Sequence, residues 1–565
     1  MQEFDFDIVK KYTALINSML VKCAKACRFP LPECGFSVDM PKDRKNGDFS
    51  TNIAMVLAKF LKRKPIDIAE ELLPKLKLVA ERAADPAHKD IVDIQIAGAG
   101  FINFYLYDGF LSQVIEAIEM AGDKYGESQI GHGKTIMVEY VSANPTGPMH
   151  MGNARGGALG DSLMNLLRCC GFSVTGEFYL NDFGNQIEKF TNSLVARYMQ
   201  SFGDYPFPED GYHGGDVTQI AMEFKKIFGN KYGSKESSEL REHITEFGLK
   251  ANIAEMKRVL NKYRVVHDTW FSESTLHNSG EVKRIIKLLV ENGKAYKSED
   301  GAVFIKCTDK DEVLVRSNGI PTYFAADIAY HYDKLVKRKF DLTINIWGAD
   351  HHAHIARLKD ALEALGVNPD RIVVITMQLV RLVKSGEQVR MSKRTGNSIT
   401  LSDLIEEIGV NAARFFFNMR QPNSHFDFDL ELAVEESSNN PVYYVQYAYA
   451  RICSIIRQLK DEGLEHVAVY NAALLQLNSK EEEAILHKLA VFPSEIENAA
   501  KNFEVHGLVR YLIELANCFH TFYNAHRVMV DDYELKLGRY KLICSVKIVI
   551  EKILNILKVD APEVM

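Results

Sequence analysis

The stretch that most constrains the fold of this chain is residues 138–161, VEYVSANPTGPMHMGNARGGALGD. It begins as a short apolar run with β-branched residues, which is typical of a buried strand, and the segment NPTGP interrupts that run as a turn. From about Met151 the segment is rich in Gly and Ala, and Leu159, Leu163 and Leu166 continue it at helical spacing. The sequence therefore predicts a strand, a tight turn and a helix in direct succession.

His150, Gly152 and Asn153 stand at the start of this predicted helix. The first turn of a helix carries unpaired backbone N–H groups and roughly half a unit of positive charge, which suits a phosphate group. Gly152, Gly156 and Gly157 would also let a flat ring or a phosphate chain approach the backbone closely. A helix that merely packs tightly on a sheet uses the same small residues, so the pattern alone leaves both interpretations open.

A second informative stretch, VRMSKRTGN at residues 389–397, brings adjacent cations and a glycine together. Such a loop suits a triphosphate, because negative charge moves onto the departing pyrophosphate when the α-phosphorus is attacked. On composition alone, a solvated basic loop is the commoner explanation.

Composition places the chain among large proteins with real cores, because it has 565 residues and is 47% hydrophobic. The net charge of −7 gives no overall nucleic-acid signal, although basic residues outnumber acidic ones between Lys10 and Lys64. That basic segment is either a solvated helix face or a candidate contact for a phosphate backbone. Nine cysteines without a CxxC pair, no apolar leader and no membrane-length apolar run predict a cytoplasmic protein without membrane contact.

The pattern along the chain predicts three domains. Residues 1–115 read as an α+β module, and residues 436–565 read as an all-α domain. Between them, residues 130–405 alternate strands and helices as expected of an α/β, doubly wound (Rossmann-type) parallel sheet, with strands that include AVFIK and LTINIWGAD. A polar section over about 190–300 is predicted to be an insertion between the two halves of this sheet.

Two of these stretches resemble the signatures of class I aminoacyl-tRNA synthetases. The order Pro-x-His-x-Gly-Asn after a strand resembles the HIGH signature, with Asn153 in place of the second His, and its flanks are similar to the arginine-specific members. Met391, Ser392 and Lys393 match the KMSKS signature in register, with Arg390 and Arg394 at its ends. The resemblance implies that His150, Asn153 and Lys393 are catalytic.

The resemblance also implies which residues bind ATP. They are the turn and helix start after the first strand, the end of a later strand, and the second signature. By number these are Ala143, Asn144, Pro145, Thr146, Gly147, Pro148, Met149, His150, Met151, Gly152, Asn153, Gly348, Asp350, His354, Met391, Ser392 and Lys393.

An arginine site should offer carboxylates in a fork, because a guanidinium is planar and always charged. The resemblance assigns the arginine contacts to Glu139, Asn144, Tyr323, Asp327, Asp350 and His351. Tyr323 and Asp327 are four residues apart, so on a helix they would share one face. The alternatives are core packing for Tyr323 and a helix N-cap for Asp327. A fork rejects lysine by leaving acceptors unpaired, so we expect no editing domain.

The segment WGADHHAH at residues 347–354 also allows a zinc site, because it places three imidazoles and a carboxylate close together. Side chains alternate at a strand end, and no outlying Cys or Glu has metal spacing. We therefore expect no protein-held metal, and magnesium carried by the ATP phosphates.

In the helical tail, Tyr444, Tyr447 and Arg451 share one predicted helix face. Such a stripe is usually core packing, but aromatic residues and Arg also stack on unpaired bases. The tail resembles the anticodon-binding domain of arginyl-tRNA synthetases, and the N-terminal module resembles their tRNA-contacting domain. The resemblance implies tRNA contacts at Tyr444, Tyr447, Arg451, Phe519, Tyr523 and Met565.

Together these resemblances imply an ATP-dependent enzyme that forms arginyl-adenylate and transfers arginine to the 3′ end of tRNA(Arg) in protein synthesis. We expect it to act as a monomer, with L-arginine, ATP and tRNA(Arg) as partners. The alternatives are a nucleotidyltransferase or ligase that uses the same fold on a small acceptor, and a non-catalytic tRNA-binding relative.

Overall fold

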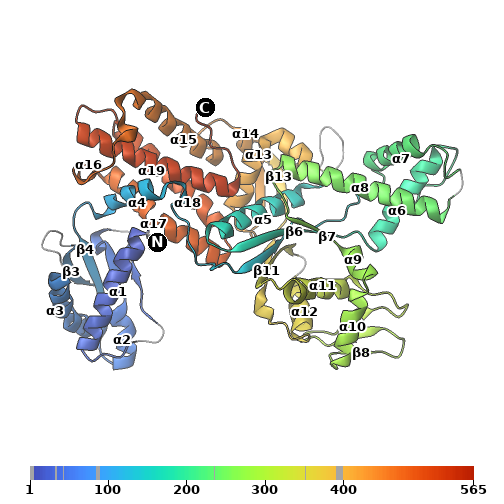
Figure 1. Cartoon of the computed structure of the whole chain (residues 1–565), viewed down its shortest axis with the longest axis horizontal. Coiled ribbons are helices and arrows are strands. Elements are labelled where there is room, and N and C mark those ends of the chain that lie inside the picture. Colours follow the sequence, from blue (N-terminus) through green and yellow to red (C-terminus); the bar gives the residue numbers. More distant parts are fainter. Residues whose placement is uncertain are drawn as a thin grey trace.

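The computed structural model describes residues 6–31, 35–41, 44–83, 90–233, 236–349, 352–389 and 399–565. Figure 1 shows the N-terminal domain at one end, a central sheet, and a helical C-terminal domain packed against that sheet on the side of α5. Among the described helices, none combines the length and the apolar character needed to cross a membrane.

The central sheet has five parallel strands in the order β12-β11-β5-β6-β7 among the described residues. Their bounds are β5 (Thr135–Glu139), β6 (Ser173–Leu180), β7 (Thr269–Ser272), β11 (Leu342–Gly348) and β12 (Ile372–Met377). The order reverses between β5 and β11, and ligands of such sheets bind at the carboxyl ends of the strands beside that reversal. The predicted doubly wound fold is confirmed.

Helix α5 (Met151–Cys169) follows β5 and lies directly on the sheet. Close approach requires glycine at Gly160, because a Cβ there would overlap the ring of Tyr140, the residue that follows β5. The apolar face of α5 includes Leu159, Leu163 and Leu167, all of which are buried. The predicted strand, turn and helix therefore form one packed unit.

Two segments leave this sheet, where one insertion was predicted. The first, between β6 and β7, forms helices α6 (Asn185–Gln200), α7 (Gly215–Phe228) and α8 (Ser238–Lys262) with a hydrophobic core of their own. The second, between β7 and β11, contains α9 (Glu273–Asn278), α10 (Glu281–Glu291), β8 (Ala295–Lys297), β9 (Val303–Ile305), β10 (Glu312–Val315) and α11 (Tyr323–Tyr332).

This arrangement corrects two expectations. The segment AVFIK was predicted to join the parallel sheet, but β9 pairs antiparallel with β8 and β10 in a separate sheet. Strand β7 lies inside the predicted insertion and was missed, because TWFS is only four residues long and follows a long polar helical stretch.

The N-terminal domain has an antiparallel sheet in the order β1-β2-β4-β3, covered by helices. Its elements are α1 (Ile8–Ala26), β1 (Val38–Asp39), β2 (Phe49–Thr51), α2 (Ile53–Leu61), α3 (Pro65–Ala83), β3 (Ile91–Ala97) and β4 (Phe101–Leu106), and α4 (Gln113–Ala121) leads to the central sheet. The predicted α+β module is confirmed.

After β12 the chain forms α13 and a three-stranded sheet, and then the helical domain. These elements are β13 (Val380–Lys384), β14 (Glu387–Val389), α13 (Leu401–Met419), β15 (Phe426–Asp429), α14 (Leu430–Val434), α15 (Pro441–Gln458), α16 (Asn471–Leu475), α17 (Lys480–Asn502), α18 (His506–Ala525) and α19 (Tyr533–Leu557). One continuous hydrophobic core connects this domain to the sheet and to the N-terminal domain.

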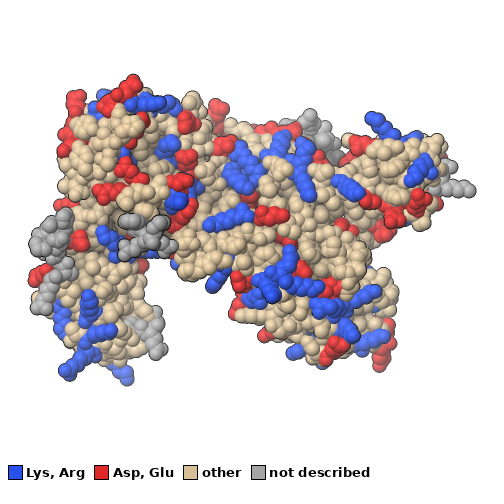
Figure 2. Space-filling model, viewed as in Figure 1, with Lys and Arg blue, Asp and Glu red and all other residues tan. Residues whose placement is uncertain are grey.

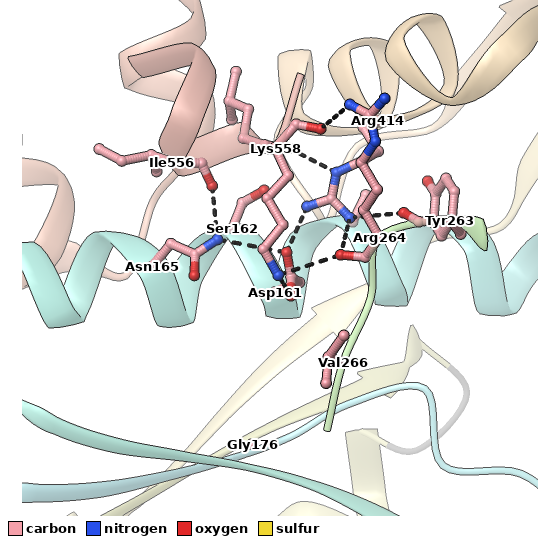
Figure 3. Close-up of polar contacts among 12 residues, drawn as sticks. Asp161, Ser162, Asn165, Gly176, Tyr263, Arg264, Val266, Arg414, Ile556 and Lys558 are labelled. Atoms are coloured by element: carbon pink, nitrogen blue, oxygen red, sulfur yellow. Dashed lines mark hydrogen bonds and ion pairs between the residues drawn. The ribbon is translucent and has the colours of Figure 1, made fainter. Parts of the chain in front are cut away.

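A buried ion-pair cluster joins the end of α19 to α5 and α13 (Figure 3). Asp161 on α5 accepts hydrogen bonds from Arg414 on α13 and from Lys558, each at 2.6 Å. Arg414 also donates to the backbone carbonyl of Leu557 at 2.6 Å. The cluster fixes α5, the helix that His150 caps, against both neighbouring helices.

Candidate active site

A cavity of about 1360 Å³ lies at the carboxyl ends of the central strands, beside the reversal of strand order. Its wall includes most of the residues that the sequence pointed to. Those present are Glu139, Ala143, Asn144, Thr146, Gly147, Pro148, Met149, His150, Gly152, Asn153, Tyr323, Asp327, Gly348 and His354. Pro145 and Met151 belong to the same turn and helix start without lining the cavity.

Five predicted residues lie outside the described part of the chain: Asp350, His351, Met391, Ser392 and Lys393. The residues on either side of the second signature are described. Strand β14 ends at Val389, and Thr400, which caps α13, lines the cavity. The backbone N–H of Leu401 donates to the carbonyl of Met149 at 2.8 Å, so the chain leaving that signature is joined to the turn before His150.

His150 caps the N-terminus of α5. Its Nδ1 accepts a hydrogen bond from the backbone N–H of Gly152 at 3.2 Å, and Asn153 Oδ1 accepts from the backbone N–H of His150 at 3.0 Å. Burial lowers the pKa of His150, so the neutral ring is favoured and carries its proton on Nε2. Asn153 thus replaces a second His with a capping amide, whose NH₂ end can donate to a phosphate.

Glu139 ends β5 and is paired with Lys334, a residue that the sequence analysis missed. Lys334 Nζ donates to Glu139 Oε2 at 2.6 Å, and Ser142 Oγ donates to Glu139 Oε1 at 3.0 Å. Both charged side chains are buried. Burial lowers the pKa of Lys334, and the neighbouring Glu139 carboxylate opposes that effect. One wall of the cavity is therefore a carboxylate held in place from two sides.

Tyr323 and Asp327 lie on α11 and line the same cavity as Glu139 at the end of β5. Asp327 Oδ2 is 2.9 Å from Nε2 of His354, and burial raises the pKa of Asp327, an effect that His354 opposes. Tyr323 is 71% exposed, so core packing does not explain it. Thr322 is the N-cap of α11, which excludes a capping role for Asp327. Two carboxylates and an accessible aromatic ring thus border one recess.

Lys334 had a detectable signal in the sequence. It follows Tyr323 by eleven residues and Asp327 by seven, the spacing of one helix face. Residues 212–216 of the first insertion also line the cavity, and nothing in their sequence marked them.

In the helical domain, Tyr447 and Arg451 of α15 lie beside Tyr523 of α18. The Arg451 guanidinium is 4.9 Å from the Tyr523 ring centroid and 5.9 Å from that of Tyr447. Tyr447 is 39% exposed, and Tyr444 is half-buried. Phe519 is fully buried, so its predicted tRNA contact is corrected: this side chain packs in the core of the domain. The terminal Met565 is exposed.

Basic residues gather at one end of the N-terminal domain, around the turn between α2 and α3 (Figure 2). The exposed basic residues here are Lys59 near the end of α2 and Lys62, Arg63 and Lys64 in the turn. Arg63 is paired with Glu71 at 2.8 Å, and Lys62 and Lys64 extend from the same turn. The basic run seen in the sequence is therefore a solvent-exposed surface.

Three family models match consecutive parts of the chain. An arginyl tRNA synthetase N terminal domain matches residues 10–106, a class I (R) tRNA synthetase catalytic domain matches residues 114–437, and a DALR anticodon binding domain matches residues 445–565. The chain is 51% identical to an arginine–tRNA ligase of Caldanaerobacter subterraneus subsp. tengcongensis, over 94% of this chain and 93% of that protein. It is 47% identical to an arginine–tRNA ligase of Heliobacterium modesticaldum, over 95% and 94% of the two chains.

Solved structures are similar as well. A putative arginyl-tRNA synthetase from Campylobacter jejuni superposes with a TM-score of 0.73 at 29% identity, covering 81% of this chain and all of that one. The Thermus thermophilus arginyl-tRNA synthetase superposes with a TM-score of 0.73 at 20% identity, covering 98% of this chain and all of that one, and shows the same fold.

Proposed function

The chain belongs to the arginyl-tRNA synthetase family, and from this premise we propose how its residues divide the reaction between them. It is an arginine–tRNA ligase, which activates L-arginine with ATP and transfers it to tRNA(Arg) in protein synthesis. In the first step the arginine carboxylate attacks the α-phosphorus of ATP and pyrophosphate leaves. In the second, a terminal ribose hydroxyl of tRNA attacks the adenylate carbonyl and AMP leaves.

We propose that the start of α5 holds the ATP phosphates. His150 Nε2–H and the NH₂ group of Asn153 are donors at one end of the cavity, at the N-terminus of α5, whose dipole favours a phosphate. The Lys393 cation, outside the described residues, would complete this set on the pyrophosphate side. No side chain needs to form a covalent bond, so orientation and charge stabilisation supply the rate.

We propose that the recess between Glu139 and Asp327 binds the arginine side chain. A guanidinium has five N–H donors in a plane, and two carboxylates that line one cavity can accept several of them. Tyr323 offers an accessible ring for stacking, and Asn144 in the turn after β5 offers an amide. Asp350 and His351 remain proposed contacts from the adjoining segment.

Magnesium is proposed to enter with the ATP phosphates. The described residues contain no group of three or more His, Cys, Asp or Glu side chains placed to hold a metal ion, so they offer no protein cage for it. When bound, magnesium would neutralise part of the phosphate charge. The chain's own contribution there is the donor set at the start of α5.

The two outer domains are proposed to bind tRNA(Arg). Tyr444, Tyr447, Arg451 and Tyr523 form an aromatic and cationic surface suited to unstacked bases, and Met565 lies in the same domain. The basic turn between α2 and α3 suits a phosphate backbone. We further propose that the protein is a monomer and acts in the cytoplasm. Sedimentation at working concentrations would test the monomer.

Two observations support the assignment as an arginine–tRNA ligase. The chain is 51% identical to one such enzyme over 94% of its length, and an acidic recess lies in the same cavity as His150. The test is arginine-dependent exchange of pyrophosphate into ATP, with and without tRNA(Arg). Exchange with arginine is expected, and its absence under both conditions would contradict the enzyme. Efficient exchange with lysine or glutamine would contradict the proposed recess.

A further inference from the structure

Beside the wall of the cavity lies a buried lysine to which the proposed reaction gives no role. Lys334 has no exposed surface and sits in the π-helical turn Asp333–Lys337 that continues α11. Its Nζ donates to Glu139 at 2.6 Å and to Asn345 Oδ1 at 3.0 Å, and it lies 3.8 Å from the Tyr330 ring centroid. Burying an ammonium group costs desolvation free energy unless the group is paired and hydrogen-bonded. These three partners offset that cost for Lys334.

The charges at this end of the cavity leave one negative charge unmatched. Glu139 and Asp327 are two carboxylates, and Lys334 is one ammonium bonded to the first of them. Asp327 is bonded to His354, which lines the same cavity. A bound guanidinium would supply a second permanent cation for these two carboxylates.

Two further carboxylates near Lys334, Glu177 and Asp333, share one cation, Arg338. Glu177 on β6 accepts two hydrogen bonds from Arg338, at 2.5 and 3.0 Å, and one from the Tyr330 hydroxyl at 2.6 Å. Burial lowers the pKa of His331 far below its usual value, which keeps it neutral. Burial also raises the pKa of Glu273, which pairs with His277, and of Tyr179.

We propose that Lys334 is a specificity-determining residue of the arginine recess, because its buried ammonium holds the Glu139 carboxylate in place while cancelling one of the two carboxylate charges. The inference rests on the proposed role of Glu139 as an arginine contact. Lys334 and Ser142 each occupy one acceptor position, on Oε2 and Oε1 respectively. Each oxygen of the Glu139 carboxylate keeps one further lone pair as an acceptor. These two acceptors together form a fork that matches two N–H groups of a guanidinium.

Without this ammonium, Glu139 would be a buried carboxyl with no cation beside it. An unpaired buried charge is unfavourable, and one of the two groups that hold this carboxyl in place would be missing. The acceptor fork that the guanidinium needs would then be lost or displaced. The recess would then favour arginine less over an uncharged analogue of the same shape, such as citrulline.

The first test compares Lys334→Met with Lys337→Met, whose lysine lies in the same turn but is exposed and pairs with Glu281. Lys334→Met should raise the arginine KM by on the order of tenfold to a hundredfold, the range for losing a hydrogen bond to a charged group. The ATP KM should stay constant, and the preference for arginine over citrulline as a competing ligand should fall. An arginine KM that matches that of Lys337→Met would overturn the inference.

The second test is a double-mutant cycle with Glu139→Gln, which also serves if Lys334→Met alone fails to fold. The double variant removes both charges and therefore leaves no unpaired carboxylate buried at this site. Because Lys334 acts through Glu139, adding Lys334→Met to Glu139→Gln should leave the arginine KM unchanged. A further rise would overturn the inference while leaving the recess intact. No effect of Glu139→Gln itself would instead contradict the proposed recess, and the inference with it.

Discussion

Replacing Arg414 by methionine tests whether the cluster in Figure 3 holds α5, α13 and α19 together. Arg414 is fully buried, and Asp161 is 1% exposed. The variant keeps a long apolar side chain in the same space, so its main effect is electrostatic. Asp161 would keep only Lys558, and the carbonyls of Leu557 and Tyr263, which accept from Arg414 at 2.6 and 3.1 Å, would lose their donor.

The expected loss is large for a single substitution. Breaking a buried ion pair by removing one partner costs about 3–5 kcal/mol. Lys558 stays bonded to the other oxygen of Asp161, but its side chain is 33% exposed and it compensates only in part. We therefore expect the free energy of unfolding to fall by about 3 kcal/mol, at the lower end of that range.

Calorimetry and urea unfolding would measure this loss. The matched control is Lys547→Met on α19, whose pair with Glu551 is partly exposed at both ends and should contribute at most about 1 kcal/mol. Combining Arg414→Met with Asp161→Asn removes both buried charges and should recover at least half of the lost stability. A loss below about 1 kcal/mol for Arg414→Met, or a double variant no more stable than the single one, would refute this reasoning.

Three further outcomes are expected. Asp327→Ala should raise the arginine KM by about tenfold or more, the cost of a lost charged hydrogen bond, with the ATP KM unchanged; equal effects on both would mean that Asp327 is structural. Gly160→Ala should lower the melting temperature, at a cost of about 1–3 kcal/mol, because its Cβ overlaps Tyr140; Gly157→Ala, with 3.4 Å to its nearest neighbour, is the control. Burial lowers the pKa of His267 to about 4, so between about pH 6.5 and 4 the folded protein binds fewer protons than the unfolded chain. The free energy of unfolding should therefore fall by about 3 kcal/mol as the pH drops through this range. His267→Phe should remove that part of the acid sensitivity in urea unfolding, and an unchanged pH dependence would contradict the assignment.

The fold class and the place of the site could be predicted because their determinants are local. The apolar run, the turn 144–148 and the Gly-rich helix start are neighbours in sequence, and they fold into β5, its turn and α5. The spacing of Tyr323 and Asp327 correctly placed both on one helix beside the cavity. Periodicity also indicated the helices of the last domain.

Features that depend on distant parts of the chain could not be predicted in this way. Lys334 meets Glu139 across 195 positions and Arg414 meets Asp161 across 253, and neither pair leaves a local pattern. The predicted tRNA contact of Phe519 was wrong for a related reason. Helix α18 packs against α15, α17 and α19, so an aromatic residue on this helix can face either the core or the solvent. Helical spacing alone does not tell which face is covered.

The position of Lys558 has a consequence for how this chain could be recombined with its relatives. Although the anticodon-binding match runs to the last residue, the stretch just after α19 completes a charge cluster seated inside the catalytic domain. A chimaera joined between residues 437 and 445 would import a foreign chain end into that cluster. Such an exchange should keep its stability only when the donor brings a cation to the place of Lys558, because Asp161 otherwise keeps Arg414 alone.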